Sequence, residues 1–266
     1  MSWPQFAFAI TVVACAPAFA DFLYFPPLDP KFFGNLQQSE SHCGPASAVN
    51  SFVYLQRLYP NIYGARLVPS ADPQNPTQAE MQSAETNLAS SMHTDATGTS
   101  SPDFIKGKQE YMDGVAFGVS SFFVQMAEMW PVQDGVKPPY VSDSTNPTAI
   151  FIYTQLKKGR DVEILGVKNG VLGHWVTVTG ITYDTAIGSG TIDYVDPDTG
   201  MAAHSRLDGT SFGGLAINLD FQLLTAVSEG PVSTLLPEPK TGVLVAIGAS
   251  LIVCVRRRSR RRLAAG

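Results

Sequence analysis

Cysteine is scarce in this chain, and its few positions limit what it can do. The 266 residues hold three cysteines: Cys15 in an apolar stretch near the N-terminus, Cys254 in another near the C-terminus, and Cys43 between them. If both end segments are sorting signals, the folded part keeps Cys43 alone. A lone cysteine can form neither an internal disulfide nor a zinc site rich in thiolates. Cys43 is therefore either a small buried hydrophobic group or a residue with a chemical role.

Basic side chains are also sparse outside the C-terminal end. Of the 18 lysines and arginines, six are the arginines Arg256, Arg257, Arg258, Arg260, Arg261 and Arg262. The rest of the chain has 12 basic against 23 acidic residues. A nucleic-acid-binding protein needs a basic face on its folded part, so the composition argues against nucleic acid as a partner. Phosphate-binding loops, clusters of metal ligands and dinucleotide motifs are missing too, and we expect no cofactor and no metal.

The N-terminal segment has the pattern of a secretory signal peptide. Residues 3–20 carry no charge and end in Ala18-Phe19-Ala20, a small-residue cleavage pattern before Asp21. We expect residues 1–20 to be removed, although no Lys or Arg precedes the apolar run. Two alternatives stay open. The segment could be a buried helix, or Val12-Val13-Ala14-Cys15 could act as a lipobox that lipidates Cys15.

The C-terminal end contains three parts in order. Pro237-Glu238-Pro239 is followed by the uncharged, mostly apolar run 241–255 and then by the arginine cluster. As a helix the run is roughly 22 Å long, against a hydrocarbon core of about 30 Å. We expect a transmembrane helix that enters the inner membrane transiently. Because the run is short, spanning needs a thinner bilayer or arginine side chains that snorkel to the interface. The arginines should stay on the cytoplasmic side.

This order resembles the PEP-CTERM sorting signal of bacterial envelope proteins. The resemblance implies that an exosortase-type enzyme recognises Pro237-Glu238-Pro239 and removes the tail, in the manner of other cleaved hydrophobic anchor signals. A plain membrane anchor is the alternative. We expect a protein that is exported across the inner membrane and ends in the cell envelope, on the outer surface or in the extracellular matrix. The expected parts are a signal peptide 1–20, one domain 21–224, a linker 225–236 and the sorting signal 237–266.

Between these ends, the hydrophobic period changes halfway along the chain. The first half has helical spacing of apolar residues, and the second half alternates apolar with polar or β-branched residues. Helices first and an antiparallel sheet afterwards predict an α+β fold. Helices are expected at 43–59, 78–92, from 101 onward and at 146–158, and strands at 161–167, 174–184, 190–197 and 215–227, with 115–126 a strand or short helix.

Cys43 stands at the start of the first expected helix. Pro45 suits a first helical turn, because its missing N–H has no partner there in any case. The unpaired N–H groups and the positive end of the helix dipole favour an anion at this position. A thiolate is such an anion, so the position suits a nucleophile, which also needs a base and a group to orient that base.

Four histidines could serve as the base. His42 adjoins Cys43, and neighbours along a turn usually point apart. His93 and His204 lie in polar segments and are expected to face solvent. His174 begins a strand after Gly173, which leaves room for a partner to approach, so His174 is our candidate.

The orienting group and the oxyanion donor are chosen by position. Asp196 lies 22 residues after His174, on the next expected strand, where a hairpin can bring it beside the imidazole. Asp198 and Asp193 are the second and third choices. Gln37, six residues before Cys43, could hold a developing oxyanion together with the Cys43 backbone N–H. Gln38 is the near alternative.

At this point the chain resembles the papain-like cysteine peptidases of the bacteriocin-leader-processing type. The motifs that carry the resemblance are Gln37, Cys43-Gly44-Pro45, "GHWVTVTG" and "VDPDTG", in that order within residues 37–200. The resemblance implies a papain-like fold with the nucleophile at a helix N-terminus. It also implies the roles of Gln37 as oxyanion donor, Cys43 as nucleophile, His174 as base and Asp196 as orienting group. No transporter is attached, so leader processing is not implied, and Ser41-His42 stands where an acidic residue is common.

The sequence therefore predicts an exported hydrolase, a cysteine peptidase that cleaves a peptide or protein substrate. Other interpretations stay open. The same groups could transfer acyl chains to an amine, the protein could be an inactive envelope or matrix protein on the same scaffold, or it could be a lipid- or membrane-anchored binding module.

Overall fold

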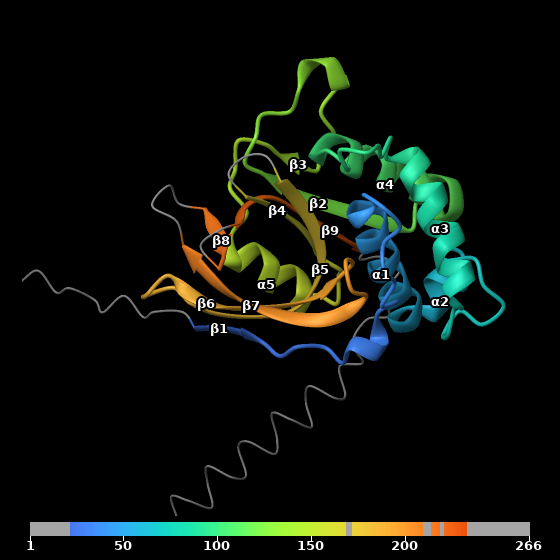
Figure 1. The fold of residues 1–266 in the computed structure, drawn as a ribbon, viewed down its shortest axis with the longest axis horizontal. Coiled ribbons are helices and arrows are strands. Elements are labelled where there is room, and N and C mark those ends of the chain that lie inside the picture. The colour runs from blue at the N-terminus through green and yellow to red at the C-terminus, as the bar shows by residue number, and fades with distance from the viewer. Residues whose placement is uncertain (1–21, 169–171, 210–213, 219–220, 233–266) are drawn as a thin grey trace, which may run out of the picture.

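The computed structural model describes residues 22–168, 172–209, 214–218 and 221–232 (Figure 1). The predicted signal peptide, the sorting signal and the turn at 169–170 lie outside the described residues.

Most helices form one layer beside the strands (Figure 1). The helical elements are α1 (Cys43–Leu58), α2 (Pro60–Tyr63), α3 (Gln78–Ser91), α4 (Ser101–Ala116) and α5 (Ala149–Lys157), with 3-10 turns η1 (Pro30–Phe32) and η2 (Val132–Asp134). α1 packs against α3 and β5, and α3 packs against α4, whereas α5 packs on β1 and β5. The helices predicted from 43, 78 and 101 are confirmed. The helix predicted at 146–158 corresponds to α5. Its cap is Thr148, whose side chain accepts a hydrogen bond from the Phe151 N–H, and not Thr145 or Asn146.

Nine strands form one sheet. They are β1 (Phe22–Phe25), β2 (Ser120–Met126), β3 (Val141–Ser142), β4 (Glu163–Lys168), β5 (Leu172–Asp184), β6 (Ser189–Asp196), β7 (Met201–Gly209), β8 (Leu215–Ile217) and β9 (Phe221–Pro231). β5 to β9 are each antiparallel to the next, and β4 pairs with both β5 and β9. Six strands, β4 to β9, thus close into a barrel, while β1 pairs with β5, β2 with β9, and β3 with β2.

The predicted papain-like α+β fold, with helices packed on an antiparallel sheet, is wrong. The sheet is a mostly antiparallel barrel of six strands with three further strands attached. The pairing register shifts at two places in the barrel. One shift in the β5–β6 pairing lies between Val178 and Gly180 of β5, and one in the β4–β9 pairing lies between Leu165 and Gly166 of β4. Such bulges bend a strand and increase its twist, which helps a sheet to close. Alternating hydrophobicity is the same in open and closed sheets, so the sequence pattern could not show the closure.

Two further predictions are corrected. Residues 225–231, expected to be part of a linker, belong to β9, where Val227 pairs with Glu163 on β4 and with Val124 on β2. The described residues contain no helix that is long and apolar enough to cross a membrane. The predicted transmembrane helix at 241–255 lies outside these residues, and nothing in the described part supports the prediction.

A fully buried charged cluster lies between the helical layer and the barrel. The ammonium group of Lys108 on α4 lies 3.0 Å from Asp161 Oδ2, 2.6 Å from Glu163 Oε1 and 3.4 Å from Glu229 Oε2, and all four side chains are inaccessible to solvent. One cation therefore faces three carboxylates. Burial raises the pKa of Glu163 to about 8, helped by Asp161 and opposed by Lys108. Burial likewise raises the pKa of Glu229 to about 7 against the effect of Lys108.

Candidate active site

α1 begins at Cys43, and its first turn is not capped by the side chain that precedes it. The N-cap residue His42 makes no side-chain hydrogen bond to the helix, so the first N–H groups keep no cap. Gly44 lets the helix start lie against the loop before α4, because a Cβ there would be 2.9 Å from the Thr99 side-chain oxygen. The same loop is held by Trp175, whose indole N–H donates to the Thr99 carbonyl at 3.0 Å.

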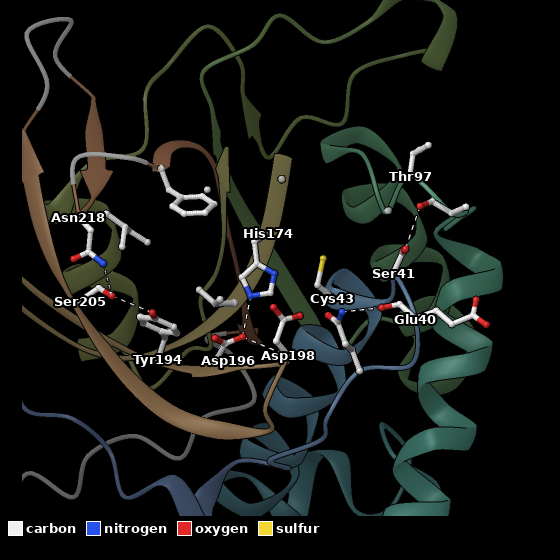
Figure 2. A pocket seen from close by; sticks show the side chains of 18 residues that line it. Glu40, Ser41, Cys43, Thr97, His174, Tyr194, Asp196, Asp198, Ser205 and Asn218 are labelled. Carbon is white, nitrogen blue, oxygen red and sulfur yellow. Dashed lines mark hydrogen bonds and ion pairs between the residues drawn. The ribbon is translucent and has the colours of Figure 1, made fainter. Parts of the chain in front are cut away.

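His174 lies between Cys43 and Asp196 (Figure 2). Its Nε2 is 2.9 Å from Asp196 Oδ1, and the other edge of the ring faces the sulfur of Cys43. His174 comes from β5 and Asp196 from the end of β6, which pair as neighbouring antiparallel strands. Trp175, next to His174, stacks on Phe104 of α4 with ring centroids 3.9 Å apart, which fixes this part of β5 against the helices.

The electrostatics of the site favour a charged histidine. Burial alone lowers the pKa of His174, but its hydrogen bond to Asp196 and its interaction with Cys43 outweigh burial and raise the pKa to about 10. The hydrogen bond to His174 in turn lowers the pKa of Asp196. At neutral pH the imidazolium is thus held between the Asp196 carboxylate and the Cys43 sulfur.

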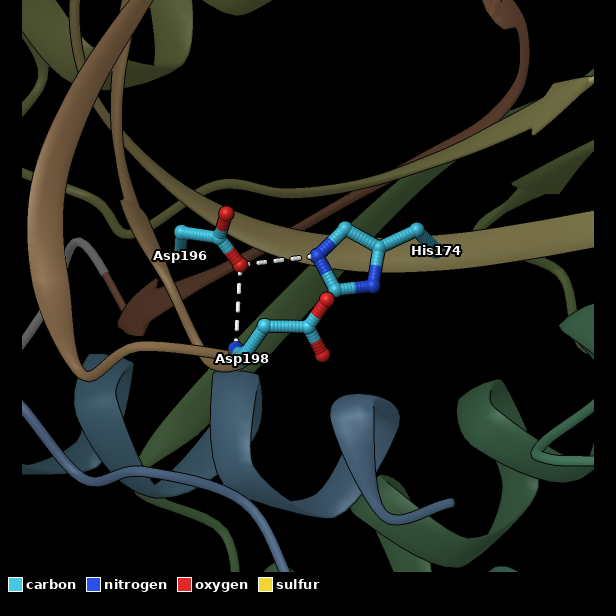
Figure 3. A group of neighbouring side chains, drawn as sticks. All are labelled: His174, Asp196 and Asp198. Atoms are coloured by element: carbon cyan, nitrogen blue, oxygen red, sulfur yellow. Dashed lines mark hydrogen bonds and ion pairs between the residues drawn. The ribbon is translucent and has the colours of Figure 1, made fainter. Parts of the chain in front are cut away.

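Asp198, the second choice for the orienting group, lies next to the first (Figure 3). Its backbone N–H donates to Asp196 Oδ1 at 3.0 Å, while its exposed carboxylate lies near the His174 ring. His174, Asp196 and Asp198 can each offer one metal-ligand atom within 4.8 Å of the others. The ring nitrogen Nε2 is already engaged with Asp196. Asp193, the third choice, pairs in register with His204, so it does not orient His174.

The two glutamines before Cys43 differ in position. Gln37, the predicted oxyanion donor, does not line the cavity that holds Cys43; its amide donates to the Asp198 carbonyl at 3.0 Å and its side chain lines a separate, smaller hollow. Gln38 does line that cavity, with its amide donating to the Glu40 carbonyl at 2.8 Å. The backbone N–H of Gln38 also donates to the Pro197 carbonyl at 2.7 Å. The segment before α1 is therefore tied to the turn that carries Asp196.

The other histidines lie elsewhere. The imidazole Nδ1 of His42 is 3.5 Å from the buried Glu85 on α3. The side chain of His93 is 79 % exposed, and His204 is exposed on β7, as the sequence predicted for both. His174 is the histidine that lines the cavity with Cys43.

The cavity has a volume of about 730 Å³ and extends from Cys43 to the mouth of the barrel (Figure 2). At the barrel end, the Tyr194 hydroxyl is 3.0 Å from Ser205 Oγ, and the Asn218 amide donates to the same oxygen at 3.3 Å. At the other end, the loop 96–98 lies against Ser41, whose hydroxyl donates to the Ala96 carbonyl at 3.1 Å. None of these lining residues was predicted. Three of them, Tyr194, Ser205 and Asn218, lie in or beside strands whose placement the closed barrel determines.

A thiol, an imidazole and a carboxylate in line define a nucleophilic site able to attack a carbonyl carbon. Among known proteins, no protein-family model matches the chain, and no curated protein matches it either.

Proposed function

We propose that the protein is an exported cysteine peptidase in which Cys43 attacks the peptide bond, His174 transfers the proton and Asp196 orients His174. The observation that carries the proposal is the placement of the His174 ring, bonded at 2.9 Å to Asp196 on one side and facing the Cys43 sulfur on the other. The raised pKa of His174, about 10, supports an imidazolium paired with a thiolate in the resting enzyme.

The reaction follows from these positions. The Cys43 thiolate bonds to the carbonyl carbon, and the carbonyl oxygen becomes an oxyanion. The His174 imidazolium gives its proton to the leaving amine as the C–N bond breaks, which leaves a thioester and a neutral imidazole. The imidazole then takes a proton from water as the water attacks the thioester. The acid is released, and the thiolate and imidazolium are restored.

The oxyanion donor is assigned to Gln38 together with the open Cys43 backbone N–H. Gln38 lines the cavity with Cys43, whereas Gln37 holds the Asp198 carbonyl outside it. The amide of Gln38 has to turn from the Glu40 carbonyl toward the substrate, a rotation that needs no backbone movement.

Substitution of the two glutamines tests this assignment. Gln38→Ala is expected to lower kcat by about a hundredfold to a thousandfold, the effect of losing one oxyanion donor, with little change in KM. Gln37→Ala loses a hydrogen bond to the turn and is expected to lower kcat by less than about tenfold. Steady-state kinetics on one peptide substrate measures both. A larger loss in Gln37→Ala would return the role to Gln37.

Peptide hydrolysis itself is tested with a peptide library and mass-spectrometric detection of products. The wild-type protein is expected to cleave a subset of the library, and Cys43→Ala to cleave none. Adding a primary amine separates hydrolysis from acyl transfer, because a transferase forms the amide product in preference to the acid.

The state of Cys43 is tested by alkylation with iodoacetamide, read at Cys43 by peptide mapping. The thiolate–imidazolium pair predicts fast alkylation of the folded protein at about pH 6, where an ordinary thiol is nearly inert. His174→Ala is expected to slow the reaction at that pH to the rate of an ordinary thiol. If Cys43 reacted only after denaturant was added, it would be a packing residue and the peptidase proposal would fail.

A further inference from the structure

The cavity that holds Cys43 is lined by more acidic than basic side chains. They include three carboxylates, those of Glu40, Asp196 and Asp198, and no lysine or arginine among the described residues that line it. The imidazolium of His174 offsets one carboxylate. The lining therefore keeps an excess of negative charge at neutral pH.

Two of these carboxylates are available to a ligand. Asp196 is engaged with His174, but neither the Glu40 nor the Asp198 carboxylate has an ion pair or hydrogen bond within the described part of the chain. Asp198 lies beside the His174 ring, and Glu40 lies on the opposite side of Cys43 (Figure 2). The loop that carries Glu40 is held in place by the preceding residue, because the N–H and the hydroxyl of Ser39 both donate to the buried Glu85.

We infer that the cavity selects substrates with a cationic group close to the bond that reacts. This inference rests on the proposed function. A cleft lined by one sign of charge concentrates ligands of the opposite sign and can raise their association rates by about tenfold or more. Asp196 and Asp198 lie on the His174 side of the nucleophile, and the Glu40 side chain lies further along the cavity and extends away from the sulfur (Figure 2), so the potential acts on parts of the substrate that flank the reacting carbonyl.

The cationic group can come from two sources that share this chemistry. One is a lysine or arginine side chain within a few residues of the scissile bond. The other is a free N-terminal ammonium group, which would make the enzyme act near chain ends. Two kinds of peptide separate these sources. One has an acetylated N-terminus and an internal arginine, and the other has a free N-terminus and no basic residue. Faster cleavage of the first indicates a basic side chain, and faster cleavage of the second indicates the N-terminal ammonium group.

The charge of the cavity can be tested without any peptidase activity. Cys43 of the full chain is treated with two methanethiosulfonates, one carrying a quaternary ammonium group and one a sulfonate, and modification at Cys43 is followed by peptide mapping. Each rate is divided by the rate for a small free thiol. The cationic reagent is expected to be favoured by about tenfold or more, and about 0.5 M salt should reduce the preference.

Matched variants locate the effect. Glu40→Gln is expected to lower the preference several-fold and Glu40→Lys to lower it further. Glu110→Gln removes an exposed carboxylate of α4 that does not line the cavity and is expected to leave the preference unchanged. Equal normalised rates for the two reagents, or an equal change in Glu40→Gln and Glu110→Gln, would overturn the inference.

Peptides then test the substrate preference itself. Peptides with arginine, glutamine or glutamate at each position around the cleaved bond are compared by kcat/KM, and the arginine or free-amine peptides are expected to lead. If all are cleaved equally, the selectivity is wrong while the peptidase stands. If none is cleaved but the cationic reagent is still preferred, the peptidase proposal fails and the charge of the cavity remains as the inferred binding property.

Discussion

Replacing His174 by alanine is expected to lower kcat for peptide hydrolysis by about a thousandfold or more. The variant loses both the proton donor for the leaving amine and the cation that stabilises the Cys43 thiolate. Folding should be little affected, because the ring lies at a cavity and is not part of the tightly packed core. Single-turnover kinetics with the most reactive peptide, together with circular dichroism to check the fold, measures the effect.

The other three histidines are the matched controls. His93→Ala and His204→Ala remove exposed rings, and His42→Ala removes a ring that faces the buried Glu85 and does not line the cavity with Cys43. Each is expected to keep kcat within about tenfold of the wild type. Loss of activity in one of these variants, with His174→Ala still active, would show that the triad has been assigned to the wrong histidine.

Replacing Lys108 by methionine is expected to destabilise the protein by about 3–5 kcal/mol at pH 7, because the buried acidic groups around it, still partly ionised at this pH, lose their one cation. The matched control is Lys106→Met on the same helix. Lys106 is part-exposed and pairs with Asp134 at 3.1 Å, so that its loss should cost about 0–1 kcal/mol. Urea denaturation of the three proteins gives the difference, and equal losses would contradict the importance of the buried cluster.

The same cluster makes stability depend on pH with a definite sign. The pKa values of Glu163 and Glu229 in the folded protein, about 8 and about 7, lie above their usual value of 4.5. Between the usual value of 4.5 and the raised values of about 7 and about 8, the folded state therefore binds more protons than the unfolded state. The free energy of unfolding is greatest near pH 4.5 and falls as the pH rises to about 8. His174 adds to the fall only above its usual value of 6.5. Glu163→Gln should flatten the profile, and the penalty of Lys108→Met should shrink at about pH 5.

Local features of the fold could be predicted from the sequence. Helix starts carry their own signals: Thr77 and Glu80 form a reciprocal cap on α3, and Pro102 sits in the first turn of α4. The alternating pattern around His174 predicted β5, and Gly188 and Gly190 are typical of the turn that joins β5 to β6. Since that hairpin fixes which residues lie opposite one another, Asp196 could be placed near His174 before the structure was known.

Non-local features could not be predicted in this way. β4 lies between β5 and β9, and its second pairing depends on residues about 60 positions further along the chain. β7 could not be predicted because it lacks a regular alternation: Met201 and His204, which lie on opposite faces of the strand, are both exposed. Gln38 lines both the cavity that holds Cys43 and the smaller hollow, whereas Gln37 lines the smaller hollow alone, so one residue of register decides which amide can meet the nucleophile.

The position of β9 also determines how the chain can fail. β9 pairs with β2, β4 and β8 at once, although it is the last strand in the described part of the chain. A chain interrupted before Phe221 would leave rows of unpaired backbone N–H and C=O groups on all three partners. Such open edges recruit strands from other molecules. Incomplete synthesis or proteolytic loss of this one segment would therefore yield a self-associating species and not a smaller folded domain.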